Sequence, residues 1–157
     1  MIANILFVCL GNICRSPLAE AALRQAIAAR ALDMGVDSAG TGDWHVGKPP
    51  DRRAVAVARR HGIDISGYRA RQVSAEDFVR FTHILALDAD NLRDLEVERP
   101  TGATARLSLL LDYVPGRAGG GVVDPYFGGD EGFEVAWADV TTGVEGFLDA
   151  LTGSGAA

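Results

Sequence analysis

Cysteine is scarce in this sequence, and the scarcity limits the kind of protein it encodes. Only two of the 157 residues are cysteines, Cys9 and Cys14. Two cysteines cannot form the disulfide framework that holds small secreted domains together, so we expect a cytoplasmic protein with reduced thiols. Their spacing also differs from the ligand spacing of zinc sites. We expect neither a metal nor another cofactor.

A basic surface and a long apolar run are also missing. The net charge is −6 and the basic residues are scattered, whereas nucleic-acid binding requires a basic face. No stretch reaches the roughly 18 apolar residues of a membrane span, and the apolar residues near the N-terminus lack the basic flank of a signal peptide. We expect a monomer with no nucleic-acid and no membrane partner, folded as one domain over residues 1–157.

The sequence does contain an alternation of two apolar patterns. Short continuous apolar runs predict strands buried on both faces, and apolar residues at helical spacing predict helices between them. We predict strands within 4–10, 36–40, 82–88 and 105–114, and helices within 17–27, 51–61, 89–96 and 133–151, with a short helix opened by the capping pattern at 74–77. The leucine-rich run 105–114 fits a helix as well as a strand. The alternation indicates an α/β fold, a parallel sheet with helices on both faces.

Particular residues refine two of these helices. Ser16 and Pro17 stand where the N-cap and the first residue of a helix are expected. In the C-terminal helix, Gly143 and Gly146 should each weaken helix formation by about 1 kcal/mol relative to alanine.

The most informative loop is CLGNICRS, residues 9–16, which follows the first predicted strand. In a parallel sheet, binding sites form in the loops after the carboxyl ends of the strands. Cys9 is a nucleophile, Arg15 offers a bidentate fork for a tetrahedral oxyanion, and a helix N-terminus attracts anions. Gly11 and Asn12 tolerate backbone conformations that other residues avoid. The loop predicts a phosphate cradle built around a thiol. In the alternative, Cys9 is a buried apolar side chain and Arg15 a surface charge.

Several stretches resemble a known family, the low-molecular-weight protein tyrosine phosphatases. VCLGNICRSPLAEA resembles the family signature, and the likeness continues in DSAGTGDWHVGKPPD, HGIDISGYRARQV, NLRDL and DPYFG, in matching order over nearly the whole chain. The resemblance implies a three-layer fold, in which helices flank a four-stranded parallel sheet. It also implies hydrolysis of phosphotyrosine proteins and small aryl phosphates through a phosphocysteine intermediate.

The resemblance assigns a role to each residue of the first loop. Cys9 is the nucleophile, and Arg15 holds the phosphoryl oxygens. Ser16 stabilises the departing thiolate, and Asn12 holds the loop, with Ser38 as its partner. Cys14 is the partner of Cys9 in a reversible disulfide, with a packed free thiol as the alternative. The backbone N–H groups that bind phosphate or another oxyanion belong to Leu10, Gly11, Asn12, Ile13, Cys14 and Arg15.

Further roles fall outside that loop. Asp124, in the glycine-flanked segment 119–130, matches the general acid of the family, although aspartate before proline is also a common turn residue. Trp44 and Tyr126 match residues that flank the substrate ring, with ordinary packing as the alternative. The sequence departs from the family pattern at two places. Tyr68 stands where many relatives have histidine, and Phe127 stands where tyrosine is commoner. For the three histidines we expect a surface position or core packing and no catalytic role: His45, His61 and His83.

Three other functions remain open at this point. A protein-arginine phosphatase of the same fold has threonine where this chain has Ile13. This difference favours phosphotyrosine over phosphoarginine as the substrate. An arsenate reductase needs resolving cysteines in a separate segment, and this chain has none outside the loop. A non-catalytic phosphotyrosine-binding module would not need Cys9 and Asp124.

Overall fold

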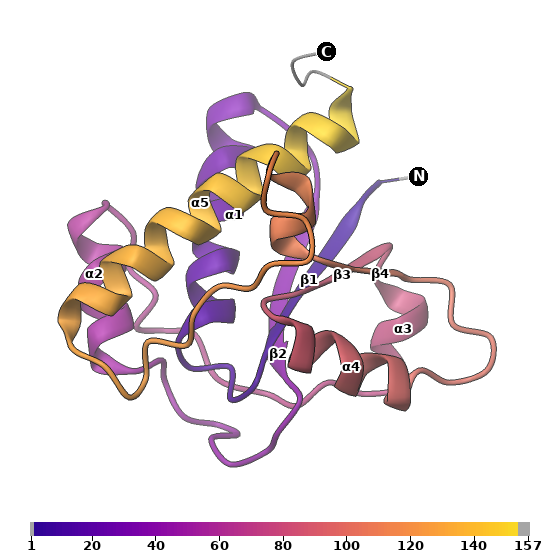
Figure 1. The fold of residues 1–157 in the computed structure, drawn as a ribbon, viewed down its shortest axis with the longest axis horizontal. Coiled ribbons are helices and arrows are strands. Elements are labelled where there is room, and N and C mark those ends of the chain that lie inside the picture. Colours follow the sequence, from indigo (N-terminus) through magenta and orange to yellow (C-terminus); the bar gives the residue numbers. More distant parts are fainter. Residues whose placement is uncertain (1, 154–157) are drawn as a thin grey trace.

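Four parallel strands form a single sheet between two layers of helices in the computed structural model, which describes residues 2–153 (Figure 1). The strands are β1 (Asn4–Cys9), β2 (Gly35–Gly40), β3 (His83–Ala86) and β4 (Arg106–Leu109). The helices are α1 (Arg15–Arg30), α2 (Arg52–Arg60), α3 (Asp77–Arg80), α4 (Ala89–Glu98) and α5 (Asp130–Thr152), with a 3₁₀ turn η1 (Leu110–Tyr113). The predicted α/β class is confirmed.

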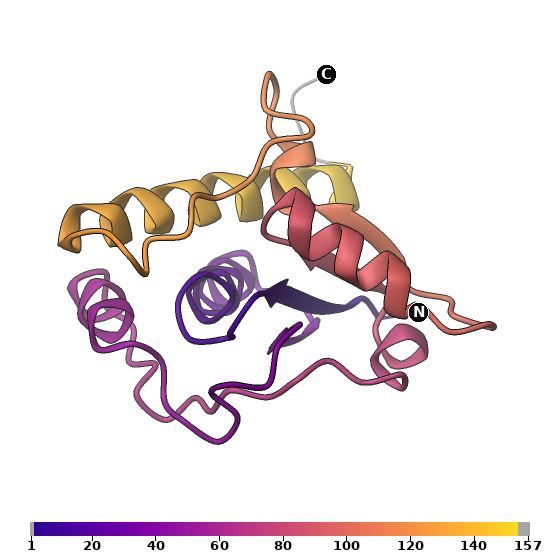
Figure 2. The same cartoon turned by 60° about the horizontal axis from the view of Figure 1, so that its bottom comes forward.

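The central strand β1 is buried on both faces, as its unbroken apolar run predicts. Its residues alternate between two clusters of buried side chains. Ile5 and Phe7 pack with side chains from α1, α2 and α5, whereas Leu6 and Val8 pack with side chains from α3 and α4. Figure 2 shows α3 and α4 on one side of the molecule and α2 on the other. The strand is therefore fixed from both sides, and so is the residue at its end.

The order of the strands places a crevice at the carboxyl end of β1. The sheet runs β2-β1-β3-β4, so the chain leaves β1 toward one side and later returns to its other side. Loops that diverge at such a switch point leave room for a ligand. Cys9, the last residue of β1, lies opposite Gly40, the last residue of β2. The fold thus puts the first predicted loop where a binding site is expected.

The start of α1 differs from the prediction. The helix begins at Arg15 with Cys14 as its N-cap, so Ser16 and Pro17 are the second and third helical residues. The Ser16 hydroxyl does not cap the helix, because it contacts the Cys9 sulfur instead. Pro17 is tolerated there because backbone N–H groups in the first helical turn need no helical acceptor.

The short helix α3 also begins later than its capping pattern suggests. The Asp77 carboxylate accepts a hydrogen bond from the Ser74 backbone N–H at 2.8 Å, which is one half of the predicted capping box. The regular helix starts only at Asp77, with Glu76 as the N-cap. Asp77 also forms an ion pair with Arg71, so its carboxylate serves a tertiary contact as well as a local one.

The ambiguous run 105–114 is divided between two structures. Its first part is β4, and its second part is the turn η1, which packs against α5. Gly143 and Gly146 allow this contact. A Cβ added to Gly143 would lie 2.6 Å from Leu110 Cγ, and one added to Gly146 would lie 2.3 Å from the Tyr113 carbonyl oxygen. None of the helices in residues 2–153, α5 included, is long and apolar enough to cross a membrane.

These contacts reverse the effect expected from helix propensity for Gly146→Ala. The new methyl group would collide with a backbone carbonyl, which cannot rotate away. Overpacking costs about 1–3 kcal/mol, more than the ~1 kcal/mol that alanine contributes to a helix over glycine. We expect a lower free energy of unfolding in urea. Gly132→Ala is the control, because its Cβ would meet only ordinary contacts, at 3.4 Å or more. Stabilisation by both substitutions would contradict this explanation.

Candidate active site

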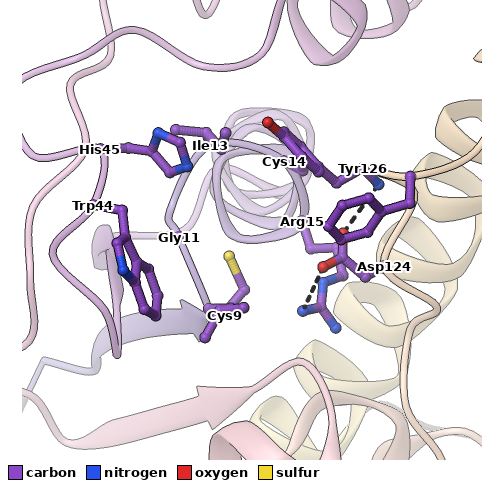
Figure 3. Close-up of a pocket in the computed structure, with 11 residues that line it drawn as sticks. Cys9, Gly11, Ile13, Cys14, Arg15, Trp44, His45, Asp124 and Tyr126 are labelled. Carbon is purple, nitrogen blue, oxygen red and sulfur yellow. Dashed lines mark hydrogen bonds and ion pairs between the residues drawn. The ribbon is translucent and has the colours of Figure 1, made fainter.

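A cavity of ≈ 150 Å³ opens at the carboxyl end of β1. Figure 3 shows Cys9 between Trp44 on one side and Arg15, Asp124 and Tyr126 on the other. The structure therefore brings together the thiol, the guanidinium and the carboxylate that the sequence singled out. The predicted site residues that line the cavity are Cys9, Leu10, Gly11, Ile13, Cys14, Arg15, Trp44, Asp124 and Tyr126. Asn12 and Ser16 are buried and do not line it.

The peptide units of the first loop are turned so that their carbonyls point outward. The Leu10 carbonyl accepts a hydrogen bond from Gly42 N–H at 2.9 Å, and the Ile13 carbonyl accepts one from Asp51 N–H at 2.8 Å. A trans peptide directs its N–H opposite to its carbonyl. Within residues 2–153, no acceptor pairs with the backbone N–H groups of residues 10–15. Unpaired N–H groups gathered in a loop form an anion site.

Asn12 holds this loop from beneath. Its backbone lies in the left-handed region, with φ 58°, which asparagine tolerates better than most residues. Its side-chain Oδ1 accepts from Arg71 N–H at 3.0 Å, and its Nδ2 donates to Ser16 Oγ at 2.8 Å and to Ser38 Oγ at 3.0 Å. The predicted contact with Ser38 is confirmed. Gly11, by contrast, does not have a positive φ. A Cβ there would lie 3.0 Å from the His45 ring, so glycine makes room for that side chain.

The direction of each hydrogen bond in this network follows from one fixed donor. The Arg71 backbone N–H can only donate, so Asn12 must turn its oxygen toward Arg71 and its amide nitrogen toward both serines. Because Asn12 donates to Ser16 Oγ, the Ser16 hydroxyl proton is free to point at Cys9 Sγ, 3.0 Å away. The Ser16 N–H also reaches the sulfur, at 3.4 Å. The hydroxyl and the backbone N–H of Ser16 are thus both directed at the Cys9 sulfur.

Arg15 is held by partners that sequence reasoning missed. Its buried guanidinium contacts the Asp88 carboxylate at 2.6 Å, the Val122 carbonyl at 2.9 Å and the Asp124 carboxylate at 3.7 Å. Burial alone would lower the pKa of Arg15, but Cys9 and Asp88 outweigh it and raise the pKa. Asp88 is also the N-cap of α4, where it accepts from Asn91 N–H. The signal available in the sequence was its place at the carboxyl end of a predicted strand.

Comparison with known proteins identifies the family. The family model described as "Low molecular weight phosphotyrosine protein phosphatase" matches residues 4–156. A Schizosaccharomyces pombe protein of that name is 39% identical over 151 residues, which are 94% of this chain and 96% of its own. The chain belongs to the low molecular weight phosphotyrosine protein phosphatase family.

Solved structures support this membership. The crystal structure of YfkJ from Bacillus subtilis has a TM-score of 0.90 and 39% identity, and the match covers 99% of this chain and 98% of that one. A structure described as a Drosophila arginine phosphatase has a TM-score of 0.88 and 37% identity, with 94% and 96% covered. The four-stranded fold implied by the resemblance is thus confirmed.

The network beneath the loop is complete without the histidine that the family resemblance implies in place of Tyr68. Glu20 Oε1 accepts from Ser38 Oγ at 2.7 Å, and Glu20 Oε2 pairs with Arg24 at 2.9 Å. Burial raises the pKa of Glu20 more than Ser38 and Arg24 lower it. Tyr68 packs against the core beside this carboxylate. The chain of contacts from Glu20 through Ser38, Asn12 and Ser16 to Cys9 is continuous without an imidazole.

Aromatic side chains form the walls of the site. The Trp44 ring lies over Gly42, where an added Cβ would be 1.9 Å from Trp44 Cζ3. Arg53 fixes the opposite wall, since it donates to the Tyr126 carbonyl at 2.9 Å and lies 5.9 Å from the Tyr126 ring centroid. Phe127 also lines the cavity and is 91% exposed. These walls suit a flat ring.

The histidines do not all behave as expected. His45 lines the cavity, a place that was not predicted for it. No local pattern marks it, because its position depends on how segment 41–50 folds over the first loop. His61 stacks on Trp137 and pairs with Glu134, and His83 packs edge-on against Phe147. For these two residues the packing prediction is confirmed.

The surroundings of Cys14 disfavour its thiolate form. Burial, followed by the negative charge of Asp51, raises the pKa of Cys14 well above that of an ordinary thiol. Both cysteines are free thiols in this structure. The reversible pairing of Cys14 with Cys9, which the family resemblance implies, stays a prediction.

Two substitutions at Asn12 separate its backbone role from its hydrogen bonds. Both Asn12→Gly and Asn12→Ala remove the bonds to Ser16, Ser38 and Arg71, but only alanine is strained at this φ. We expect both variants to unfold more easily in urea, and the alanine variant to be about 1 kcal/mol less stable than the glycine variant. The alanine variant should also bind phosphate more weakly. Equal stabilities would show that the left-handed conformation is not retained.

Proposed function

We propose that this chain hydrolyses phosphotyrosine in proteins, with Cys9 as the nucleophile. The observation that carries the proposal is the meeting of Cys9, Arg15 and Asp124 in one cavity between aromatic walls, beside backbone N–H groups that have no acceptor in the described part of the chain. The phosphoryl group supplies the charge that the N–H groups and Arg15 stabilise, and the aromatic walls hold the ring. Family membership supports the same activity.

In the first step the sulfur of Cys9 attacks phosphorus. An S–P bond forms, the bond between phosphorus and the tyrosine oxygen breaks, and its electron pair stays on that oxygen. A free phenolate is a poor leaving group because the pKa of its phenol is about 10. Asp124 donates the proton that makes tyrosine a neutral product. Asp124 lies at the rim of the cavity, where its carboxylate also accepts from Tyr126 N–H at 3.1 Å.

In the second step water attacks the phosphocysteine. The Asp124 carboxylate, now deprotonated, takes a proton from the water, and the S–P bond breaks to release phosphate. The electron pair returns to Cys9. Its sulfur leaves as a thiolate, which the Ser16 hydroxyl stabilises at 3.0 Å. Ser16 therefore serves the leaving group of this step, and Arg15 with the backbone N–H groups of residues 10–15 holds the phosphoryl oxygens in both steps.

Selection among phosphoryl substrates depends on the walls. The cradle meets the same phosphoryl group on any side chain, so discrimination requires depth. A phosphotyrosine ring fits between Trp44 and Tyr126 and gains about 0.5–1.5 kcal/mol from aromatic contacts beyond burial. Phosphoserine is too short to reach Cys9 past these rings.

Phosphoarginine is long enough and remains the second candidate, since an arginine phosphatase has the same fold. Ile13, which lines the cavity, argues against it because an apolar branched side chain cannot hydrogen-bond a guanidinium. We propose phosphotyrosine proteins as partners and a monomeric cytoplasmic enzyme. Values of kcat/KM for matched peptides with phosphotyrosine, phosphoarginine or phosphoserine decide among these substrates. A higher kcat/KM for the phosphoarginine peptide would show that the chain is a protein-arginine phosphatase.

The role of Asp124 predicts how Asp124→Asn responds to the leaving group. In wild type the rate of phosphoryl transfer to Cys9 should depend weakly on the pKa of the phenol, because Asp124 protonates the oxygen. In the variant the rate should fall steeply for phenols of high pKa, by about 10²–10⁴-fold. Single-turnover rates with a series of aryl phosphates measure this step, and Cys9→Ser, which should show no turnover, is the background control. Parallel slopes for wild type and variant would remove Asp124 from the role of acid.

A further inference from the structure

A second cavity adjoins the catalytic one on the far side of Trp44. Its volume is ≈ 220 Å³, and it shares Leu10 and Trp44 with the catalytic cavity. The remaining walls come from Thr41 and Gly42 and from helix α4, which contributes Asp94, Val97 and Glu98. None of these three α4 residues belongs to the catalytic site described above. A substrate peptide whose phosphotyrosine occupies the first cavity therefore has a second cavity directly beside it.

The apolar part of the second cavity is fixed and open to solvent. Trp44 is 66% exposed and Val97 is 81% exposed. Gly42 lets the Trp44 ring lie flat against the backbone, and Gly42 N–H is bonded to the Leu10 carbonyl of the phosphate loop. The segment next to this ring is thus bonded to the phosphate loop, and Trp44 forms a wall of both cavities. An exposed tryptophan next to a binding pocket suits a contact with another chain.

The charged part of the cavity is acidic and lacks a counterion. Asp94 and Glu98 lie one turn apart on α4, and within residues 2–153 neither carboxylate has an ion pair or hydrogen bond. Elsewhere on this segment, Asp88 pairs with Arg15 and Asp90 pairs with Arg93. Burial, followed by the negative charge of Asp94, raises the pKa of Glu98. Two neighbouring carboxylates without a cation repel each other, and a positively charged ligand would remove that repulsion.

We propose that the second cavity binds a lysine or arginine side chain that lies near the phosphotyrosine in the substrate protein. This inference rests on the proposed phosphatase function. The aliphatic stem of the basic side chain packs against Trp44 and Val97, as such stems do on apolar surfaces. Its cationic end meets Asp94 and Glu98, and the Trp44 ring adds a cation–π contact. Acidic neighbours of the phosphotyrosine are disfavoured by the same two carboxylates.

The test measures kcat/KM for phosphotyrosine peptides that differ at one position. Lysine, arginine, norleucine or glutamate is placed in turn at each of the positions flanking the phosphotyrosine. We expect lysine and arginine to exceed norleucine by about fivefold at one or two positions, the upper range for an exposed ion pair, and glutamate to be the poorest. The preference should shrink as salt is added, because salt screens exposed charges.

Substitutions on α4 then assign the preference to this cavity. In Asp94→Asn/Glu98→Gln the ratio of the lysine peptide to the norleucine peptide should fall to about one. Asp94→Lys/Glu98→Lys, which reverses both charges, should favour the glutamate peptide instead. Glu96→Gln is the matched control, because Glu96 lies exposed on the same helix and does not line the cavity. This control should keep the wild-type ratio.

Failure of this inference is distinguishable from failure of the proposed function. Wild-type turnover of p-nitrophenyl phosphate tests the phosphatase alone, since this substrate has no flanking residue. If turnover occurs but the peptides are hydrolysed equally, or if acidic flanks are preferred, the second cavity is not a basic subsite. The same conclusion follows if Asp94→Asn/Glu98→Gln keeps the lysine preference. Absence of turnover with every substrate would overturn the proposed function itself.

Discussion

The site depends on one constraint, which is that the backbone N–H groups of residues 10–15 have no hydrogen-bond acceptor within residues 2–153. Unpaired N–H groups cost free energy when they leave water, so such a loop does not form by itself. Here its carbonyls are bonded from outside by Gly42 and Asp51, and Asn12 turns the backbone through the left-handed region. A bound oxyanion would accept hydrogen bonds from these N–H groups. The free energy that they lose on leaving water would then be recovered when phosphate binds.

The rest of the fold supplies the supports that this loop needs. The switch point of the sheet opens a crevice after β1, and Gly40 at the end of β2 allows close approach, since a Cβ there would lie 2.8 Å from the Leu10 carbonyl oxygen. Arg71, 59 residues away from Asn12 in the sequence, fixes the orientation of the asparagine amide. That orientation sets the Ser16 proton toward Cys9. The Arg71 N–H thus determines, through the Asn12 amide and the Ser16 hydroxyl, which hydrogen-bond donor faces the sulfur that is proposed to react.

Local patterns predicted what short-range physics decides. The sequence alone showed three features: the apolar run of β1, the helical spacing of apolar residues in α5, and the loop from Cys9 to Arg15. The family resemblance added Asp124 and Ser38. Contacts between distant segments were not visible. The Ser16 hydroxyl looked like a helix cap because its sulfur partner lies across the loop. Gly143 and Gly146 looked like weak helix residues because η1 packs on them only in the fold. Asp88 and His45 were missed for the same reason.

The proposed mechanism requires that the phosphoryl group is bonded covalently to the Cys9 sulfur before water releases it as phosphate. The most direct measurement mixes enzyme and a phosphotyrosine peptide rapidly, quenches with acid during turnover, and locates the added phosphoryl group by mass spectrometry. Fragmentation must distinguish Cys9 from Cys14, which lies on the same short stretch of chain. We expect a phosphoryl group on Cys9 alone, which disappears as substrate is exhausted. Turnover with unmodified Cys9 at every quench time, or with the phosphoryl group on another residue, would contradict it.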